Sequence, residues 1–238
     1  GYDIANRLIS KALPNGVNTT YEYDGMSRLK RLKHHAPSGT VTDNQYSYNA
    51  ANQMSQIAEL SQTKAFMYDN VDRLTSMTNG TANESYTFDG VGNRTSSHLS
   101  NTYTYQPFNK LTATQTTTQG FDANGNTVWK SEGSKRFTYT WDYENRLGKV
   151  NDRKTTVRHW YDALGRRVMT TGGRNGTTKY TYTGLDVVMD DSSVSGITKY
   201  QNGPGIDNKL SLKTGSDVKY LLQDHLGSTI GLTDSTGT

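Results

Sequence analysis

The sequence has no cysteine and only 4 proline residues among its 238 residues. Without cysteine, neither a disulfide framework nor a thiolate metal site can form, and the redox compartment is not constrained. No stretch approaches the roughly 18 apolar residues of a membrane-spanning helix, and residues 1–8 lack the pattern of a signal peptide. The chain must therefore fold through non-covalent contacts alone.

Apolar residues are also scarce, at 32% of the chain. Such a low content usually indicates a disordered chain, because too little apolar surface is buried to offset the entropy of folding. The chain nevertheless contains 16 Tyr, 5 Phe and 3 Trp, whereas disordered segments are poor in aromatic residues. Stacked aromatic rings reconcile the two observations and predict thin sheets in place of a thick core.

The charge is moderately basic, with 26 Lys and Arg against 22 Asp and Glu. The densest basic run spans residues 28–35 and is compatible with an anionic surface or a nucleic-acid backbone. A solvent-exposed strand with alternating basic residues explains the run better, because no second run reinforces it. We therefore expect no nucleic-acid partner.

An internal repeat is the clearest feature of the sequence. Two aromatic residues separated by one position are followed by Asp, and Arg-Leu or a similar pair follows the Asp at a short distance. The Asp or its substitute recurs with a period near twenty residues, which is typical of a repeat architecture. The best copies begin at Tyr21, Phe66 and Tyr139, and the chain opens on a truncated copy at Tyr2.

Each repeat predicts a β-hairpin. The two aromatic residues lie on one face of a strand, because side chains alternate along it. The Asp is a turn residue whose carboxylate can bond the backbone two positions on, and Arg begins the returning strand, so Arg28 should lie opposite or diagonal to Asp24. Glycines occupy these turns, where a positive φ is often required, at Gly25, Gly90, Gly92 and Gly165.

These repeats resemble the RHS/YD-repeat family over essentially the whole chain. The residues that carry the repeat motif are Tyr21, Tyr23, Asp24, Arg28, Tyr68, Asp69, Arg73, Tyr86, Asp89, Trp141, Asp142, Arg146, Tyr161, Asp162, Gly165 and Arg166. A second signature, typical of the RHS-associated core that closes such arrays, consists of Asp224, His225, Leu226, Gly227 and Ser228. The resemblance implies an all-β fold in which antiparallel hairpins form a spiralling sheet that is part of a hollow shell or barrel.

The resemblance also implies a division of the chain and a cellular context. We expect a YD/RHS repeat array over residues 1–199 and a closing segment of the RHS-associated core over 200–238, as a fragment of a longer chain. In toxin-type members of the family, an Asp-Pro-x-Gly motif marks the self-cleavage site that releases a C-terminal toxin domain. This sequence has no Asp-Pro pair, so neither that site nor a cargo can be assigned.

Two groups of residues resemble known chemical sites. Asp224, His225 and Ser228 have the residue types of a hydrolytic triad, but neighbours on an extended strand point to opposite faces, so a structural turn is the better interpretation. The run that starts at Asp122 resembles half of a calcium loop, but Gly125 and Gly133 stand at the wrong positions for an EF-hand. We expect no catalytic residue, cofactor or metal ion.

The leading functional hypothesis is a non-enzymatic shell segment of a secreted or injected polymorphic toxin. Its partner would be a C-terminal toxin or cargo domain of the same polypeptide. One alternative is a cell-surface adhesion or carbohydrate-binding module, in which an exposed aromatic residue such as Trp129 stacks on glycans. The other is an extracellular structural assembly whose copies pair through open sheet edges. All three hypotheses place the protein outside the cell, and the sequence does not determine an oligomeric state.

Overall fold

The computed structural model describes residues 1–238, apart from the side chain of Asn175. The chain is folded almost entirely as antiparallel β-strands, with one short 3₁₀ helix, η1 (Gly173–Asn175). The predicted all-β fold of antiparallel hairpins is therefore confirmed. The described part of the chain contains no helix with the length and apolarity that a membrane crossing requires.

The strands belong to two compact units, which are described separately. Unit 1 consists of residues 1–85 and 208–238, and unit 2 consists of residues 86–207. The predicted division into residues 1–199 and 200–238 remains a prediction, because it concerns the type of repeat and not compactness.

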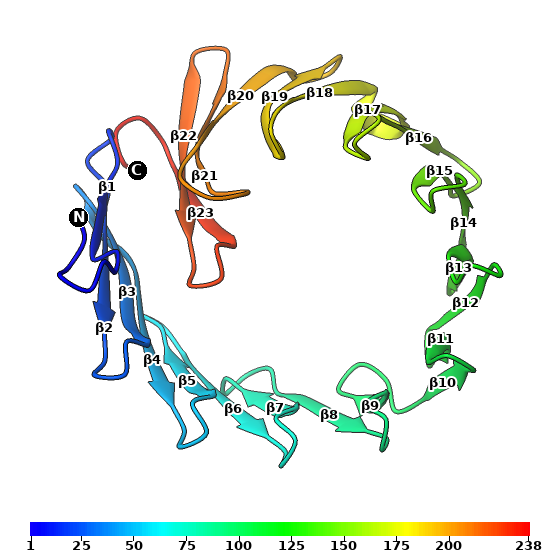
Figure 1. Cartoon of the computed structure of the whole chain (residues 1–238), viewed down its shortest axis with the longest axis horizontal. Helices are drawn as coiled ribbons and strands as arrows, with labels where there is room; N and C mark the ends of the chain where they lie inside the picture. Colours follow the sequence, from blue (N-terminus) through cyan, green and yellow to red (C-terminus); the bar gives the residue numbers. More distant parts are fainter. The chain divides into compact units, whose positions relative to one another are not determined.

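Unit 1 contains consecutive hairpins from both ends of the chain (Figure 1). Its strands are β1 (Ser10–Ala12), β2 (Asn18–Tyr23), β3 (Leu29–Ala36), β4 (Gly39–Tyr48), β5 (Met54–Ala58), β6 (Thr63–Tyr68), β7 (Leu74–Thr78), β21 (Lys209–Thr214), β22 (Asp217–Gln223) and β23 (Thr229–Thr233). From β1 to β7, each strand pairs antiparallel with the next, and β22 pairs with both β21 and β23. Strand β8 (Glu84–Phe88) contains the boundary between the units.

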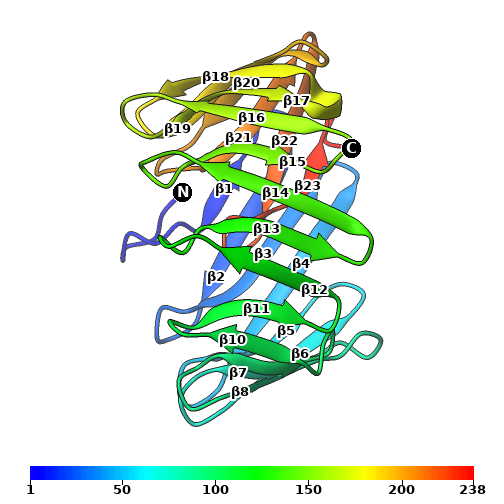
Figure 2. The same ribbon diagram turned by 90° about the vertical axis from the view of Figure 1, so that its right-hand side faces the viewer.

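Unit 2 repeats the same pattern (Figure 2). Its strands are β9 (Arg94–Ser97), β10 (Tyr103–Gln106), β11 (Lys110–Thr114), β12 (Thr117–Phe121), β13 (Thr127–Glu132), β14 (Lys135–Trp141), β15 (Leu147–Asn151), β16 (Thr156–Tyr161), β17 (Arg167–Gly172), β18 (Thr177–Thr183), β19 (Asp186–Ser192) and β20 (Gly196–Asn202). From β10 to β20, each strand pairs antiparallel with its neighbours in the sequence.

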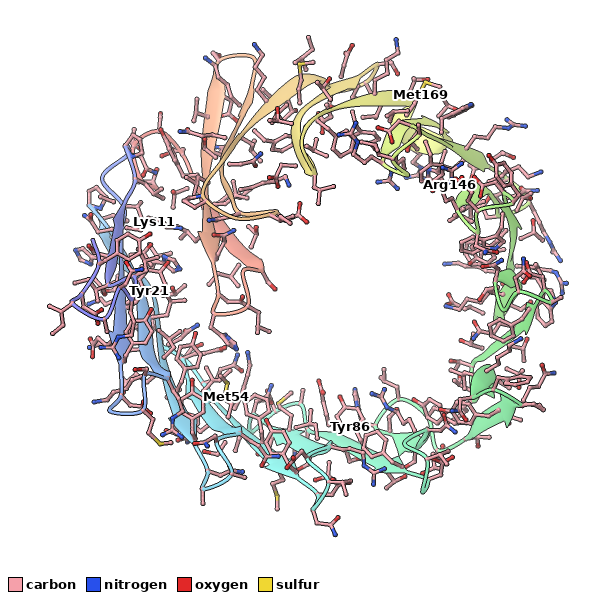
Figure 3. All side chains as sticks on the ribbon, viewed as in Figure 1. Lys11, Tyr21, Met54, Tyr86, Arg146 and Met169 are labelled. Carbon is pink, nitrogen blue, oxygen red and sulfur yellow. The ribbon has the colours of Figure 1, made fainter. Side chains whose placement is uncertain are left out.

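In unit 2, exposure alternates along β10, β14, β16, β18 and β20 as the sequence predicts, whereas β11, β13, β15 and β17 are half-buried along most of their length. Along β14, the aromatic residues Phe137, Tyr139 and Trp141 are half-buried, whereas Arg136 and Thr138 on the opposite face are exposed. Side chains line both faces of the ribbon (Figure 3). Unit 2 is therefore a single layer in which one face is aromatic and the other is polar.

Unit 1 has a small apolar core. The last hairpin, β22–β23, packs on the first strands, so that Leu222 lies in one cluster with Leu13, Val17 and Ala36. Asn15 secures the contact, since its Nδ2 donates to Oγ1 of Thr233 at 2.9 Å. The core thus lies where segments from the two ends of the sequence meet.

Candidate functional sites in the repeat turns and the last hairpin

Five of the repeat turns are held by Asp and by Arg four residues later. In the turn at Asp24, Oδ1 accepts hydrogen bonds from the backbone N–H groups of Met26 and Arg28, both at 2.9 Å. The Nε of Arg28 donates to Oδ2 at 2.7 Å, and the backbone N–H of Asp24 donates to the carbonyl of Arg28 at 2.9 Å. The predicted bond from the carboxylate to the backbone two positions on is confirmed, as is the pairing of Arg28 with Asp24.

The same arrangement recurs along the chain. Ion pairs with this spacing join Asp3 to Arg7, Asp69 to Arg73, Asp142 to Arg146, and Asp162 to Arg166. Where Arg is replaced by Asn, as at Asn93 and Asn126, the amide Nδ2 donates to the same carboxylate oxygen at 3.0 Å. At Asn49 an amide oxygen replaces the carboxylate and accepts the same two backbone bonds, from Ala51 and Gln53, both at 3.0 Å. The turn therefore depends on a side-chain oxygen at this position, and several donors can complete it.

The turn also shifts the ionisation of its Asp. At Asp24, Asp69 and Asp142, the backbone N–H and the guanidinium of the Arg four residues on stabilise the carboxylate and hold its pKa below the ordinary value of 3.8. These carboxylates are therefore acceptors of fixed hydrogen bonds, and none is positioned as a general acid.

In seven repeats the second aromatic residue is Tyr or Trp, and it connects its repeat to the preceding one by a hydrogen bond. The hydroxyl of Tyr161 donates to the carbonyl of Leu147 at 2.9 Å, and the guanidinium of Arg146 lies 5.1 Å from the centre of the Tyr161 ring. Arg146 therefore pairs with Asp142 in its own turn and covers the aromatic ring of the next repeat. This set of contacts, from Asp through Arg to the next aromatic ring and its hydrogen bond, is called the ladder below.

The ladder is present in both units. In unit 1 the hydroxyls of Tyr23, Tyr48 and Tyr68 donate to carbonyls of the preceding repeat at 2.8–2.9 Å. In unit 2 the same bond is made by Tyr105, Trp141, Tyr161 and Tyr182. The alternation of aromatic residues predicts their common face, but the tyrosine hydroxyl as a link between repeats was not foreseen.

Two of the four turn glycines that the sequence singles out have the expected positive φ, and two do not. Gly92 and Gly165 have φ of 90° and 77°, as predicted, but Gly25 and Gly90 do not have positive φ. The left-handed position is the third residue after the Asp, which is Gly165 in one turn and Ser27, Asn52, Asp72 or Asn145 in others. The earlier glycines follow the Asp directly, where the turn needs no left-handed residue, so that part of the prediction is wrong.

The Asp224–Ser228 signature forms one more turn of this kind. Oδ1 of Asp224 accepts hydrogen bonds from the backbone N–H groups of Leu226 and Ser228, both at 2.9 Å. Leu226 is 79% exposed at the tip of the turn, and Gly227 has φ of 82°. Oδ1 of Asp224 therefore serves the turn backbone, as the turn interpretation expects.

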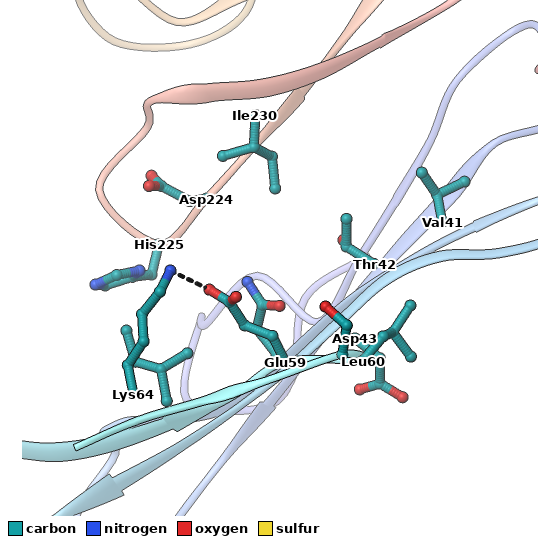
Figure 4. Close-up of a pocket in the computed structure, with 12 residues that line it drawn as sticks. Val41, Thr42, Asp43, Glu59, Leu60, Lys64, Asp224, His225 and Ile230 are labelled. Carbon is teal, nitrogen blue, oxygen red and sulfur yellow. Dashed lines mark hydrogen bonds and ion pairs between the residues drawn. The ribbon is translucent and has the colours of Figure 1, made fainter. Parts of the chain in front are cut away.

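His225 lies at the rim of a pocket of about 430 Å³ in unit 1 (Figure 4). Its ring packs at 4.8 Å from the ring of buried Tyr46, and burial lowers the pKa of His225. Asp224 also lines the pocket, as do Lys64 and Glu59, which form an ion pair with 2.6 Å between Nζ of Lys64 and Oε1 of Glu59. The ring of His225 thus packs against β4. The two charged side chains beside it, Lys64 and Glu59, are paired with each other.

Trp129 is less accessible than a glycan-stacking residue would be. It is half-buried, the guanidinium of Arg136 lies 4.6 Å from its ring, and it packs so closely on Gly120 that a Cβ there would lie 2.3 Å from Nε1. The expectation of an exposed Trp129 is therefore wrong. Its ring faces the guanidinium of Arg136, which lies on the neighbouring strand β14.

The burial of one histidine was not predicted from the sequence. His34 is 0% exposed, its Nδ1 lies 2.8 Å from Oγ1 of Thr19, and its Nε2 lies 3.0 Å from the carbonyl oxygen of Gln223. It thereby connects β3 to the end of β22, and burial lowers its pKa. In the sequence His34 lies within a basic run, and only the docking of the last hairpin distinguishes it from an exposed histidine.

Comparisons with known proteins place these features in a family. The sequence model of the Teneurin YD-shell family matches residues 1–194. The chain is also 31% identical over 165 residues to a protein of Bacillus spizizenii named tRNA3(Ser)-specific nuclease WapA, and 31% identical over 166 residues to tRNA nuclease WapA of Bacillus subtilis. Each match covers 64% of this chain but only 7% of the relative, so the chain spans a small part of the length of these proteins.

Solved structures share the fold over the whole chain. A Tc holotoxin pore from Photorhabdus luminescens matches with a TM-score of 0.77 at 19% identity, covering 100% of this chain and 15% of that one. A complex named TcdB2-TccC3-Cdc42 matches with a TM-score of 0.76 at the same identity and coverage. The chain belongs to the Teneurin YD-shell family of RHS/YD-repeat proteins.

Proposed function

We propose that this chain is a structural, non-enzymatic segment of an RHS-repeat shell that encloses a C-terminal cargo domain of the same polypeptide. The observation that carries the proposal is the ladder, which joins hairpin to hairpin through side-chain and backbone contacts in a sheet with few buried apolar residues. Such a sheet suits a wall, because its stability comes from contacts between neighbours and the sheet can be extended without a thick core.

The comparisons support a toxin context. The structures with similar folds belong to Tc toxin complexes, and the curated relatives are named as nucleases. Because the chain covers only 7% of the nuclease-named relatives, their activity is not transferred to it. The turn geometry of Asp224 agrees with a non-catalytic role. On this proposal the protein is secreted or displayed at the cell surface.

Carbohydrate binding is the weaker alternative. Trp129 is the residue expected to stack on glycans, and the guanidinium of Arg136 lies over its ring. An assembly through open strand edges has no specific observation in its favour.

Limited proteolysis of the parent polypeptide tests the proposal. If the repeats enclose a cargo, a domain beyond Thr238 resists protease until the β-sheet unfolds in denaturant, and the two become sensitive at the same denaturant concentration. A parent polypeptide that ends at Thr238, or a downstream domain that is cleaved freely while the sheet stays folded, would contradict enclosure.

A further inference from the structure

Unit 2 carries a row of exposed apolar residues along one edge. At five of its hairpin turns a large apolar side chain projects from the tip, with exposures of 73% for Val91, 90% for Phe108, 89% for Tyr143, 76% for Leu164 and 62% for Leu185. The row is interrupted once, at the turn that begins at Asp122, whose exposed tip residue Asn124 is polar. Rows of exposed apolar side chains commonly mark an interaction site. No contact described above uses these side chains, apart from the approach of Lys110 to the ring of Phe108.

Contacts between the turns show that the tips share one edge. Asn93 donates to Asn109 at 3.1 Å and Asn126 donates to Asn145 at 2.8 Å, each from one turn to the next. Nη1 of Arg166 donates to the carbonyl of Gly184 at 2.6 Å, and that of Arg146 donates to the carbonyl of Asp162 at 3.5 Å. The turns therefore stand side by side, and neighbouring hairpins place their tips about 10 Å apart.

The opposite edge of unit 2 has a different composition. Its turns consist mainly of Gln, Thr, Ser, Gly and charged residues, as in residues 115–116, 133–134 and 152–155. Leu99 and Val194 are its large apolar side chains, with exposures of 74% and 68%. The apolar row is thus a property of the edge that carries the Asp turns, and it is not a general feature of hairpin tips.

We infer that this row, called the turn edge, is an interface for a second copy of the chain. The first reason is periodicity, because apolar tips at a repeat of about 10 Å are matched in register by a partner with the same repeat. The second is two-fold symmetry. If two turn edges meet antiparallel, Val91 meets Leu185 and Phe108 meets Leu164 of the second copy, which is the self-complementary pattern of a two-fold dimer. At the centre of this arrangement Tyr143 covers the polar tip at Asn124 of the second copy.

The area available agrees with a weak dimer. Aromatic tips bury roughly 150 Å² each and aliphatic tips about 100 Å² each when covered, which amounts to about 600 Å² per copy. The total of about 1,200 Å² is at the lower limit for a specific interface. The carboxylates of Asp142 and Asp162 beside the tips are paired with Arg146 and Arg166, so the apolar tips, and not charge, govern the association of two turn edges.

Sedimentation equilibrium of the chain tests the inference, which does not depend on the enclosure of a cargo. We expect reversible dimers with a dissociation constant on the order of 10⁻⁴ M. The double variant Phe108→Asn and Leu164→Ser should raise this constant at least about tenfold. Asn suits the positive φ of 67° at position 108, so the turn is preserved.

The matched control replaces the two apolar residues of the opposite edge, as Leu99→Ser with Val194→Ser, and should change the dissociation constant by less than about twofold. Because the chain has no cysteine, a mixture of Phe108→Cys and Leu164→Cys proteins should form a mixed disulfide dimer faster than either protein dimerises alone. A strictly monomeric chain would overturn the inference. So would dimers that persist in the turn-edge variant, or dimers that both double variants weaken equally.

Discussion

Unit 1 and unit 2 are built from the same hairpins, but they bury their side chains differently. The fully buried apolar residues of the described chain all lie in unit 1, where they include Val17, Leu32 and Leu222. In unit 2, the buried residues of the described chain are polar and less completely buried, with exposures of 5% for Ser100 and 9% for Ser192. The comparison shows that the YD hairpin does not require a core, because the ladder connects each hairpin to the next, and that a core forms where a second layer docks.

The largest expected effect is in the core of unit 1. Leu222→Ala removes a side chain that is 1% exposed, and the cavity should lower the free energy of unfolding of unit 1 by about 2–4 kcal/mol. Leu226→Ala in the adjacent turn, where the side chain is 79% exposed, is the control and should change it by less than about 0.5 kcal/mol. Residue-level hydrogen exchange separates the units, and a loss of protection in unit 2 as large as in unit 1 would mean that the core stabilises both.

The next effect depends on pH and involves His34. Its pKa is below the ordinary value of 6.5 because burial disfavours the cation and Lys11 repels it. The unfolded chain therefore binds more protons, and the stability that neutral His34 provides is present above pH 6.5 and decreases as the pH falls below it. We expect protection of β22 to decrease from pH 7 to pH 5.

A pair of variants isolates this effect. His34→Gln should clearly reduce the pH dependence of β22 protection over that range, leaving the part that His225 contributes, whereas His35→Gln, on the exposed face of the same strand, should leave the pH dependence intact. His225 also packs at the docked hairpin, and burial lowers its pKa despite the nearby Asp224. If the pH dependence persists in His34→Gln and disappears in His225→Gln, the assignment to His34 is wrong.

A smaller effect is expected in the ladder of unit 2. Tyr161→Phe deletes the hydroxyl that donates to the carbonyl of Leu147, and it should destabilise β15–β16 by about 1 kcal/mol. Tyr143→Phe deletes the hydroxyl of a side chain that is 89% exposed, and it should have no measurable effect. Equal urea midpoints for the two variants would show that the hydroxyl contributes nothing to the ladder.

An effect of similar size is expected in the turns. Gly165→Ala places a Cβ at φ of 77° and should cost about 1 kcal/mol, whereas Gly25→Ala, where φ is not positive and no atom lies within 4 Å of the new Cβ, should be nearly neutral. Thermal unfolding of both variants checks the comparison. A Gly25→Ala variant that is as destabilised as Gly165→Ala would mean that the third position after the Asp has no special role.

The hairpins could be predicted from the sequence because their determinants are local. The alternation of Tyr21 and Tyr23, the turn at Asp24 and the return at Arg28 lie within eight residues, so their geometry follows from strand and turn rules. The packing of the last hairpin could not be predicted in this way, because Gln223 and His34 meet only in the folded chain. For the same reason, the sequence predicts that His34 lies on a solvent-exposed basic strand.

The central claim is that the ladder between neighbouring hairpins holds unit 2 together. Residue-level hydrogen exchange of a double variant, Arg146→Ala with Tyr161→Phe, tests it most directly, because these residues connect two adjacent hairpins without entering an apolar core. The account predicts that protection falls in β14 to β17 and stays unchanged in β10 and β11. Unchanged protection throughout unit 2 would contradict it.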